Sequence, residues 1–284
     1  MTSKTKALLF IFGAAICFSL MNILAKIVGQ RGVPFLEIAF ARALVSLLLI
    51  YAYMLLKKQS FAIKNKKALS IRIFFGVTAM FAVFYALTHM PLAESVTLFN
   101  TRPIFIALLG WLWLKEKPST KTSTSIVIAF IGVWLIFNPD TQYFKSTLLA
   151  LYAGIAMAIA MLALRKLGTS DQPLPIILYF SLWATLGTLI FGFSSFVLLD
   201  PTSLMLLILM GATVTLAQVL MTRAYALTQA AIVGAGSSIA VVVSVLFGVF
   251  FFHETLSSQA VLGIALVVTS CLALLKTRRH HHQA

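Results

Sequence analysis

The chain has 284 residues, of which 61% are hydrophobic and only 10% are charged, and its mean hydropathy is +1.00. Such a composition cannot cover a water-facing surface, and 15 Gly, 8 Pro and 2 Cys exclude collagen-like, disordered and disulfide-stabilised classes. The formal charge of +15 lies mostly between apolar runs, which argues against nucleic-acid binding and indicates an all-α integral membrane protein.

Ten apolar runs have about the length of 20 residues that a helix needs to cross a bilayer. Helices are required because lipid offers no hydrogen bonds to the backbone. The first run follows Lys4 and Lys6 as a signal peptide would, but it lacks a small-residue cleavage site, so we keep it as a span. We expect transmembrane helices at 7–28, 35–56, 69–89, 92–113, 120–138, 146–167, 174–198, 203–227, 231–252 and 257–275.

The basic residues predict the orientation of these spans. Sixteen of the 22 Lys and Arg fall on the side of the N-terminus, Arg72 among them, whereas only Arg31 and Lys145 fall on the opposite side. Because short cytoplasmic loops are rich in Lys and Arg, we expect both termini to be cytoplasmic in a bacterial inner membrane.

The first two spans carry four polar groups that a bilayer would disfavour. Asn22 and Lys26 are four residues apart and share a helix face, while Glu37 and Arg42 lie on different faces. A charge in a span needs a partner, a water-filled cavity or a function. We expect Asn22, Glu37 and Arg42 to line a central cavity; the alternative for Glu37 and Lys26 is an anchoring role at the membrane interface.

The fourth span, 92–113, contains the strongest candidate for a substrate-binding residue. Arg102 lies about 15 Å along this helix, near the membrane midplane, and Pro103 disfavours helical geometry at that point. Broken helices beside a charged group are typical substrate sites of transporters. We expect Arg102 and Asn100 to bind substrate, with Glu94 in the same lining; the alternatives are a structural pair of Arg102 with Glu94, or an interfacial role for Glu94.

The second half has weaker candidates. Gln218 lies in span 8, and Ser238 belongs to a Gly/Ser-rich start of span 9 that either binds an anion or allows tight helix packing. Trp183 lies deep in span 7, where it could stack on a ligand, and Arg223 is near enough to the end of its span to reach the cytoplasm.

The two halves repeat each other. Residues 85–88 and 225–228 both read Tyr-Ala-Leu-Thr, and Gly110 precedes Glu116 by the same six residues that separate Gly248 from Glu254. Because five spans is an odd number, the repeats 1–140 and 141–284 enter the membrane from opposite sides. The expected fold is therefore ten transmembrane helices as two inverted five-helix repeats.

Several segments resemble the EamA group of the drug/metabolite transporter superfamily over essentially the whole chain. They are Glu37-Ile38-Ala39-Phe40-Ala41-Arg42, Met90-Pro91-Leu92-Ala93-Glu94, Arg102-Pro103, Leu114-Lys115-Glu116 and Phe252-His253-Glu254. The chain departs from the family pattern at Val241, where many members have proline. The resemblance implies carriers for amino acids, nucleotide-like metabolites or drugs. Members that import S-adenosylmethionine share the Glu-x-Ala-Phe-x-Arg pattern found here at residues 37–42.

We therefore predict a secondary transporter of a small metabolite, an amino acid or amino-acid derivative, working by alternating access in the lipid bilayer. No nucleotide-binding loop appears, so transport depends on protons or a counter-substrate rather than on ATP. No cofactor or metal is expected, and the run His280–His282 is either native or an added tail. The alternatives are uptake of S-adenosylmethionine or a nucleotide-like metabolite, a non-saturable channel, and a membrane scaffold or intramembrane enzyme.

Overall fold

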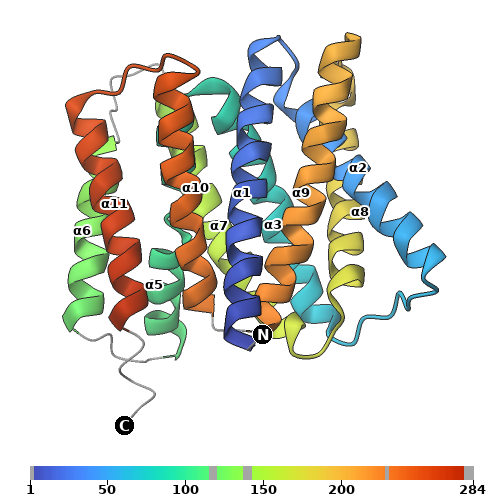
Figure 1. Cartoon of the computed structure of the whole chain (residues 1–284), viewed down its shortest axis with the longest axis horizontal. Helices are drawn as coiled ribbons and strands as arrows, with labels where there is room; N and C mark the ends of the chain where they lie inside the picture. The colour runs from blue at the N-terminus through green and yellow to red at the C-terminus, as the bar shows by residue number, and fades with distance from the viewer. Residues whose placement is uncertain (1–2, 115–119, 137–142, 228–229, 278–284) are drawn as a thin grey trace.

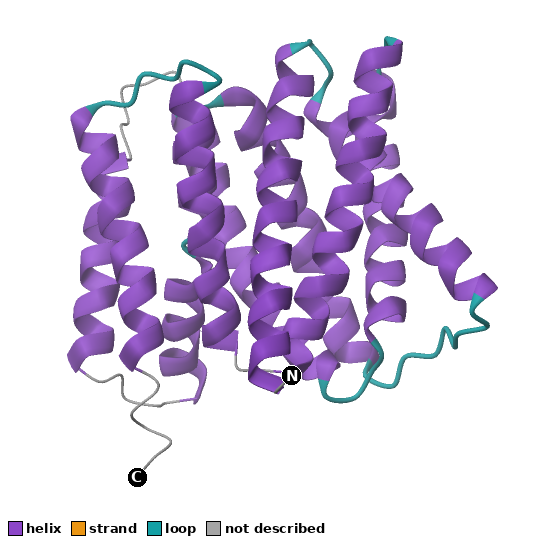
Figure 2. Cartoon of the chain, viewed as in Figure 1, coloured by secondary structure: helices purple, strands orange, loops and turns teal. Residues whose placement is uncertain are grey.

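The structure is a computed structural model that describes residues 3–114, 120–136, 143–227 and 230–277. The elements of these residues are all helical, and most are joined by loops at the two ends of the molecule (Figure 2). They are α1 Ser3–Gln30, α2 Phe35–Leu56, α3 Lys66–His89, α4 Leu92–Phe99, α5 Arg102–Leu114, α6 Thr120–Ile136, α7 Phe144–Gly168, α8 Pro173–Gly192, the 3-10 helix η1 Phe193–Ser195, α9 Pro201–Leu227, α10 Ala230–Phe250 and α11 Ser258–Thr277.

Proline sets the start of four helices. Helix α8 begins at Pro173 and α9 at Pro201, while Pro34 and Pro91 immediately precede α2 and α4. Proline suits these positions because the first turn of a helix needs no backbone N–H donor and the ring fixes φ near its helical value. Local sequence therefore determines where these helices begin.

The predicted spans correspond to the observed helices, with two differences. Span 92–113 is divided into α4 and α5 at Asn100 and Thr101, beside the predicted kink. The span predicted at 174–198 extends three residues past the helical segment, because α8 stops at Gly192 and η1 continues it only to Ser195. The apolar run continues into a loop whose Val197 amide donates to Glu37 Oε2 at 2.9 Å, so hydropathy alone overextended the helix.

The halves are inverted with respect to each other. We call the end of the molecule where α1 begins the near end and the opposite end the far end (Figure 1). Helix α1 runs from the near to the far end, whereas α7, its counterpart in the second half, runs from far to near (Figure 1). The last turn of α11 returns to the near end, so both described ends of the chain lie on one side.

The packing follows the same two-fold relation. Helix α3 packs along α7 in the way that α1 packs along α9, and the equivalent helices pair directly as α2 with α8 and α6 with α11. At the α6–α11 crossing, a Cβ on Gly132 would lie 2.7 Å from the Gly263 carbonyl oxygen, and one on Gly263 would lie 2.6 Å from the Gly132 oxygen. The two backbones touch here, which only glycine permits.

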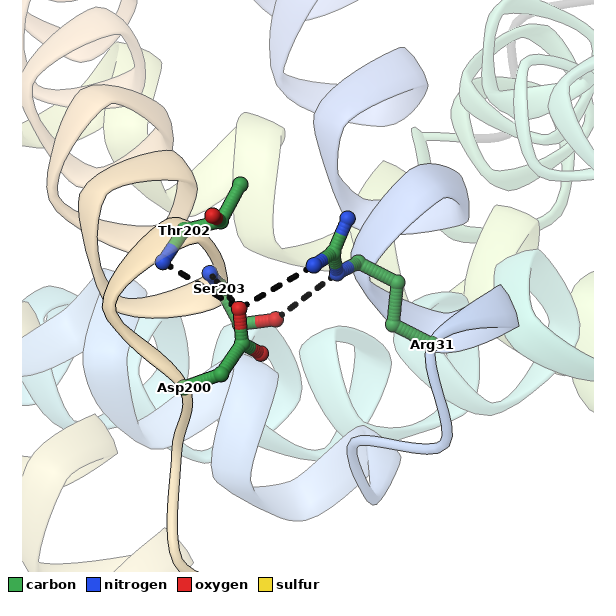
Figure 3. Close-up of polar contacts among 4 residues, drawn as sticks. All are labelled: Arg31, Asp200, Thr202 and Ser203. Carbon is green, nitrogen blue, oxygen red and sulfur yellow. Dashed lines mark hydrogen bonds and ion pairs between the residues drawn. The ribbon is translucent and has the colours of Figure 1, made fainter.

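Two polar clasps occupy equivalent loops at opposite ends. At the far end, Arg31 Nη2 lies 3.0 Å from Asp200 Oδ2, and Arg31 Nε donates to Ser203 Oγ at 3.0 Å (Figure 3). At the near end, Asp171 accepts hydrogen bonds from the amides of Lys64 and Asn65. Each clasp joins a short loop of one half to a longer loop of the other, as the inverted repeat requires.

The outer surface is apolar along the helices. Six helices (α1, α2, α3, α7, α8 and α9) are individually long and apolar enough to cross a membrane. Large side chains such as Trp134, Ile190 and Phe250 are more than 70% exposed, which in a soluble protein would be unfavourable. This surface is suited to lipid.

Candidate functional site

A cavity of about 70 Å³ lies among helices of both halves. Five of the nine side chains predicted from the sequence line it: Asn22 from α1, Arg42 from α2, Asn100 and Arg102 from the α4–α5 break, and Gln218 from α9. A sixth polar residue, Arg72 from α3, lines it as well. The cavity therefore contains three guanidinium groups from three helices.

Two of these arginines share one aromatic ring. The guanidinium carbon of Arg72 lies 4.2 Å from the centroid of the Phe180 ring, and that of Arg42 lies 5.8 Å from it. Both arginines are buried, with Arg42 8% and Arg72 7% exposed. Arg42 donates to the sulfur of Met80 at 2.6 Å, although a thioether is a weak acceptor for a charged donor.

These guanidinium groups are left with unused donors. Within the described part of the chain, Nε of Arg42 and both Nε and Nη1 of Arg72 have no hydrogen-bond partner, and neither does Oδ1 of Asn22. Buried charged donors without partners are costly in a low-dielectric interior. Aromatic faces offset part of this cost, since a cation over a ring gains about 2 kcal/mol when desolvated.

The break between α4 and α5 positions Arg102. Asn100 donates from Nδ2 to the Val96 carbonyl at 2.8 Å, and its Oδ1 accepts from Arg102 Nη2 at 2.6 Å. Gly154 on α7 packs against this break, since a Cβ there would lie 2.7 Å from Thr101 Oγ1 and 3.2 Å from the Leu98 oxygen. Hydrogen bonds of Asn100 within the first half and close packing of α7 from the second half thus both stabilise the break.

The cavity carries positive charge without an acidic counterpart among its described lining residues. The five acidic side chains that the structure describes all lie elsewhere: Glu37 and Asp200 in contacts of the far-end loops, Asp171 in the near-end clasp, and Glu94 and Glu254 in a separate cleft. Such an arrangement attracts anions.

The apolar part of the lining is adaptable. Five methionines contribute to it, namely Met21, Met80, Met157, Met161 and Met221, together with Phe84, Phe99 and Phe180. The volume of about 70 Å³ is below the several hundred Å³ of ordinary ligand sites. Flexible methionine side chains can rearrange at small cost, so the cavity can widen around a ligand.

The remaining predicted residues lie outside this cavity. Glu37 binds the Val197 amide, and Glu94 lines the far-end cleft. Trp183 is 53% exposed on the outside of α8. The sequence does not indicate this position, because the helix is apolar on every face and its periodicity cannot identify the inner side. The side chain of Ser238 lies outside the described residues, as do those of Glu116 and His280–His282.

Arg72 is the residue that the sequence did not reveal. Its position one to two turns from the start of α3 predicts a cytoplasmic charge, yet its side chain lines the cavity. Gly76, one turn later, makes room for it: a Cβ there would collide with Arg72 Nη1 and lie 2.8 Å from Phe180. An arginine followed four residues later by glycine was the available signal.

A larger cleft of about 630 Å³ opens near the far end. Lys26 Nζ lies 3.4 Å from Glu254 Oε1 and donates to the Met90 carbonyl at 2.6 Å. Both carboxylate oxygens of Glu254 accept the amide of Leu92, at 2.8 and 2.9 Å. This group of Lys26, Glu254 and the start of α4, which we call the α4 latch, connects the α10–α11 loop to the first half.

A family model described as the EamA-like transporter family matches the chain twice, over residues 5–138 and 144–276. The chain belongs to the EamA-like transporter family. As a member it is a transporter of the drug/metabolite type and not an enzyme, and its fold is the two-repeat all-α membrane fold of EamA proteins.

The relatives of this EamA-family protein are transporters, and the sequence match covers most of the length of each. A pseudopaline exporter of Pseudomonas aeruginosa is 29% identical over 271 residues, which cover 94% of each chain. A riboflavin transporter of Vibrio cholerae is 25% identical over 268 residues, covering 92% of this chain and 90% of the relative. Solute carrier family 35 member G1 of Mus musculus is 27% identical over 279 residues, covering 90% and 74%.

A solved crystal structure has the same fold, with a TM-score of 0.69 at 19% sequence identity, covering 98% of this chain and 99% of that one. This agreement concerns the arrangement of the helices alone. It supports the ten-span, two-repeat architecture in which the central cavity lies between the halves.

Proposed function

We propose that this protein carries an amino acid or amino-acid derivative whose carboxylate binds the arginines of the central cavity. The observation that carries the proposal is the meeting of Arg42, Arg72 and Arg102 in one cavity whose described lining has no acidic residue. Arginine pairs strongly with carboxylates, and such pairs are strengthened where water is excluded. An amine on the substrate would contact Asn22, Asn100 or Gln218 and the aromatic rings rather than Glu37 or Glu94.

The two repeats, 1–140 and 141–284, would alternate in exposing the cavity to either side. Equivalent clasps at the near and far ends support this proposal, since opening one end requires its own loops to separate while the other set stays joined. We propose that both termini face the cytoplasm of a bacterial inner membrane, because the basic residues gather at the near end. Protons or a counter-substrate would drive the cycle.

Among the alternatives, the charge of the cavity favours a nucleotide-like anion over S-adenosylmethionine, whose sulfonium group would add a further positive charge beside three arginines. A relative is a riboflavin transporter, and the rings of Phe84, Phe99 and Phe180 in this cavity suit a flat ligand. A channel would differ from all of these by lacking saturation and exchange.

Counterflow in proteoliposomes tests the proposal. Vesicles loaded with one unlabelled compound would be given labelled amino acids, N-acylated amino acids and nucleotides in turn. We expect saturable exchange of a carboxylate that falls at least tenfold in Arg102→Gln, while Arg223→Gln, an exposed arginine on α9, exchanges at the wild-type rate. Exchange that persists in folded Arg102→Gln, or flux without saturation, would contradict it.

A further inference from the structure

The central cavity holds buried polar groups of opposite kinds that have no hydrogen-bond partner. Nε of Arg42 and both Nε and Nη1 of Arg72 are donors without an acceptor among the described residues, and Oδ1 of Asn22 is an acceptor without a donor. These three side chains line the same cavity of about 70 Å³ and are 8%, 7% and 2% exposed, respectively. Folded proteins rarely leave several buried polar groups unpaired in one place, so the cavity indicates a ligand that carries both an acceptor and a donor.

The unpaired donors indicate one acidic group. The guanidinium carbons of Arg42 and Arg72 lie 5.8 and 4.2 Å from the centroid of the Phe180 ring, and the two charges are near enough to repel each other. A carboxylate has two oxygens that can accept from both guanidinium groups, and its charge relieves this repulsion. One acidic group satisfies these donors without Arg102, which adds positive charge to the cavity but whose Nη2 already donates to Asn100 Oδ1 at 2.6 Å.

The unpaired acceptor indicates an amine. Asn22 comes from α1, whereas the two arginines come from α2 and α3, so it offers an oxygen to the same cavity from another helix. An amide oxygen accepts hydrogen bonds from an N–H group and gains nothing from a carboxylate. A ligand with an amine next to its carboxylate would therefore satisfy the acceptor and the donors together, and this is the head group of an α-amino acid.

Most of the remaining lining of the cavity is apolar. Five methionines and four phenylalanines contribute to it, and a second cavity of about 20 Å³ shares Arg72 and Phe180 with the first and continues between Leu164, Ile176 and Ile177. These walls offer no hydrogen bonds, so a polar side chain of the ligand would lose its hydration there without compensation. An apolar side chain has no such cost, and the flexible methionines can rearrange around it.

We infer that the central cavity binds an α-amino acid with an apolar side chain, its carboxylate at Arg42 and Arg72, its amine at Asn22 and its side chain against the methionine and phenylalanine lining. This inference rests on the proposed function and narrows its substrate class from amino acids in general to apolar ones. Arg72 and Asn22 are then specificity-determining residues, Arg72 for the acidic group and Asn22 for the amine.

Compounds that each lack one part of the amino acid test this assignment. Proteoliposomes would be assayed by counterflow with leucine and phenylalanine, with their amides, which lack the carboxylate, and with 4-methylpentanoate and 3-phenylpropanoate, which lack the amine. Asparagine has nearly the shape of leucine but a polar side chain. We expect the wild type to prefer leucine over leucinamide, over 4-methylpentanoate and over asparagine by about tenfold or more in each case, because a site rejects analogues that leave its polar groups unpaired or its apolar walls against a polar group.

Two variants separate the roles of the head-group contacts. Arg72→Gln should lower the preference for leucine over leucinamide by about tenfold or more while keeping the preference over 4-methylpentanoate. Asn22→Leu, which replaces the amide by an apolar group of similar size, should have the opposite effect on the two preferences. Arg72→Lys should keep much of the preference for the carboxylate because the charge remains, and Arg223→Gln, an exposed position on α9, should leave both preferences unchanged.

Each outcome has a distinct meaning. A wild type that exchanges asparagine or 4-methylpentanoate as fast as leucine overturns the inference and leaves the carboxylate carrier standing, and so does a leucine-to-leucinamide preference that is unchanged in Arg72→Gln. Exchange of no carboxylate by the folded wild type overturns the proposed function together with the inference. If Arg72→Gln fails to fold, Asn22→Leu decides the matter, because an unaltered preference over 4-methylpentanoate in that variant would refute the inference by itself.

Discussion

Replacing Glu254 by Gln is expected to loosen helix α4. The carboxylate accepts the Leu92 amide with both oxygens, at 2.8 and 2.9 Å, and lies 3.4 Å from Lys26 Nζ. The amide of Gln keeps one acceptor for Leu92 but loses the charge that strengthens the cap and pairs with Lys26.

The expected magnitude follows from these contacts. A hydrogen bond to a charged acceptor contributes about 1 kcal/mol more than one to a neutral acceptor. The pair at 3.4 Å has a gross attraction of about 5 kcal/mol at an effective dielectric constant of 20. Most of that attraction is offset because solvent entering the adjoining cleft would hydrate the Lys26 ammonium group once its partner is neutral, so we expect a net loss of about 2 kcal/mol, or about 30-fold in the population of opened α4.

Hydrogen exchange of peptides that cover residues 92–99 measures this population. We expect α4 to exchange about 30-fold faster in Glu254→Gln. Gln259→Ala is the matched control, because Gln259 lines the same cleft but lies outside α4 and makes none of the three latch contacts. A wild-type exchange rate of α4 in Glu254→Gln would refute this prediction. So would a double variant at Lys26 and Glu254 whose effect equals the sum of the two single effects, because residues in contact should give less than that sum.

Three further predictions concern the packing and the clasps. Gly132→Ala should lower the thermal melting temperature in detergent and the free energy of unfolding by about 1–3 kcal/mol, because its Cβ would press on the Gly263 carbonyl. Gly187→Ala should leave both unchanged, because a Cβ there has no atom nearer than 3.4 Å. Gly154→Val should slow counterflow while the protein stays folded, because the new side chain displaces the α4–α5 break that positions Arg102; an unchanged rate would show that the break tolerates movement. Hydrogen bonds from Ser203, together with the Arg31 guanidinium, hold the pKa of Asp200 well below its usual range, at about 2, so the far-end clasp stabilises the fold above the ordinary Asp pKa and is lost only as pH falls through about 2. Melting curves of Asp200→Asn and wild type should therefore differ by a constant amount between pH 8 and pH 5, and a difference that vanishes by pH 5 would contradict this.

Part of the candidate site could be predicted from local sequence. Arg102 followed by Pro103 predicted a break at mid-membrane depth, and the structure has that break at Asn100 and Thr101. Asn22, Arg42 and Gln218 were identified because polar groups deep in apolar runs are costly anywhere except in a cavity. The structure brings these residues together, as expected, although their role in binding stays a prediction.

The positions of the other candidate residues could not be predicted, because the depth of a residue in the membrane does not tell in which direction its side chain points. Glu37 and Glu94 lie in the spans where they were expected, but Glu37 turns to the Val197 amide and Glu94 to the far-end cleft. Arg72 lies close enough to its helix end to be counted with the cytoplasmic charges, and only the space above Gly76 turns it inward. Trp183 could not be assigned to an inner or outer face because α8 is apolar all round.

Hydropathy, proline positions and internal repeats are local properties of the chain, so the membrane class, the ten spans, the inverted repeat and the family can all be predicted from the amino-acid sequence. Which polar groups contact one another depends instead on how the helices pack. In a bilayer nearly every face of a helix is apolar, so the pattern along one helix does not specify its rotation, and packing against its neighbours does. That packing brings the guanidinium groups of Arg42 and Arg72 within 6 Å of the Phe180 ring centroid, and it keeps the described acidic residues out of the cavity.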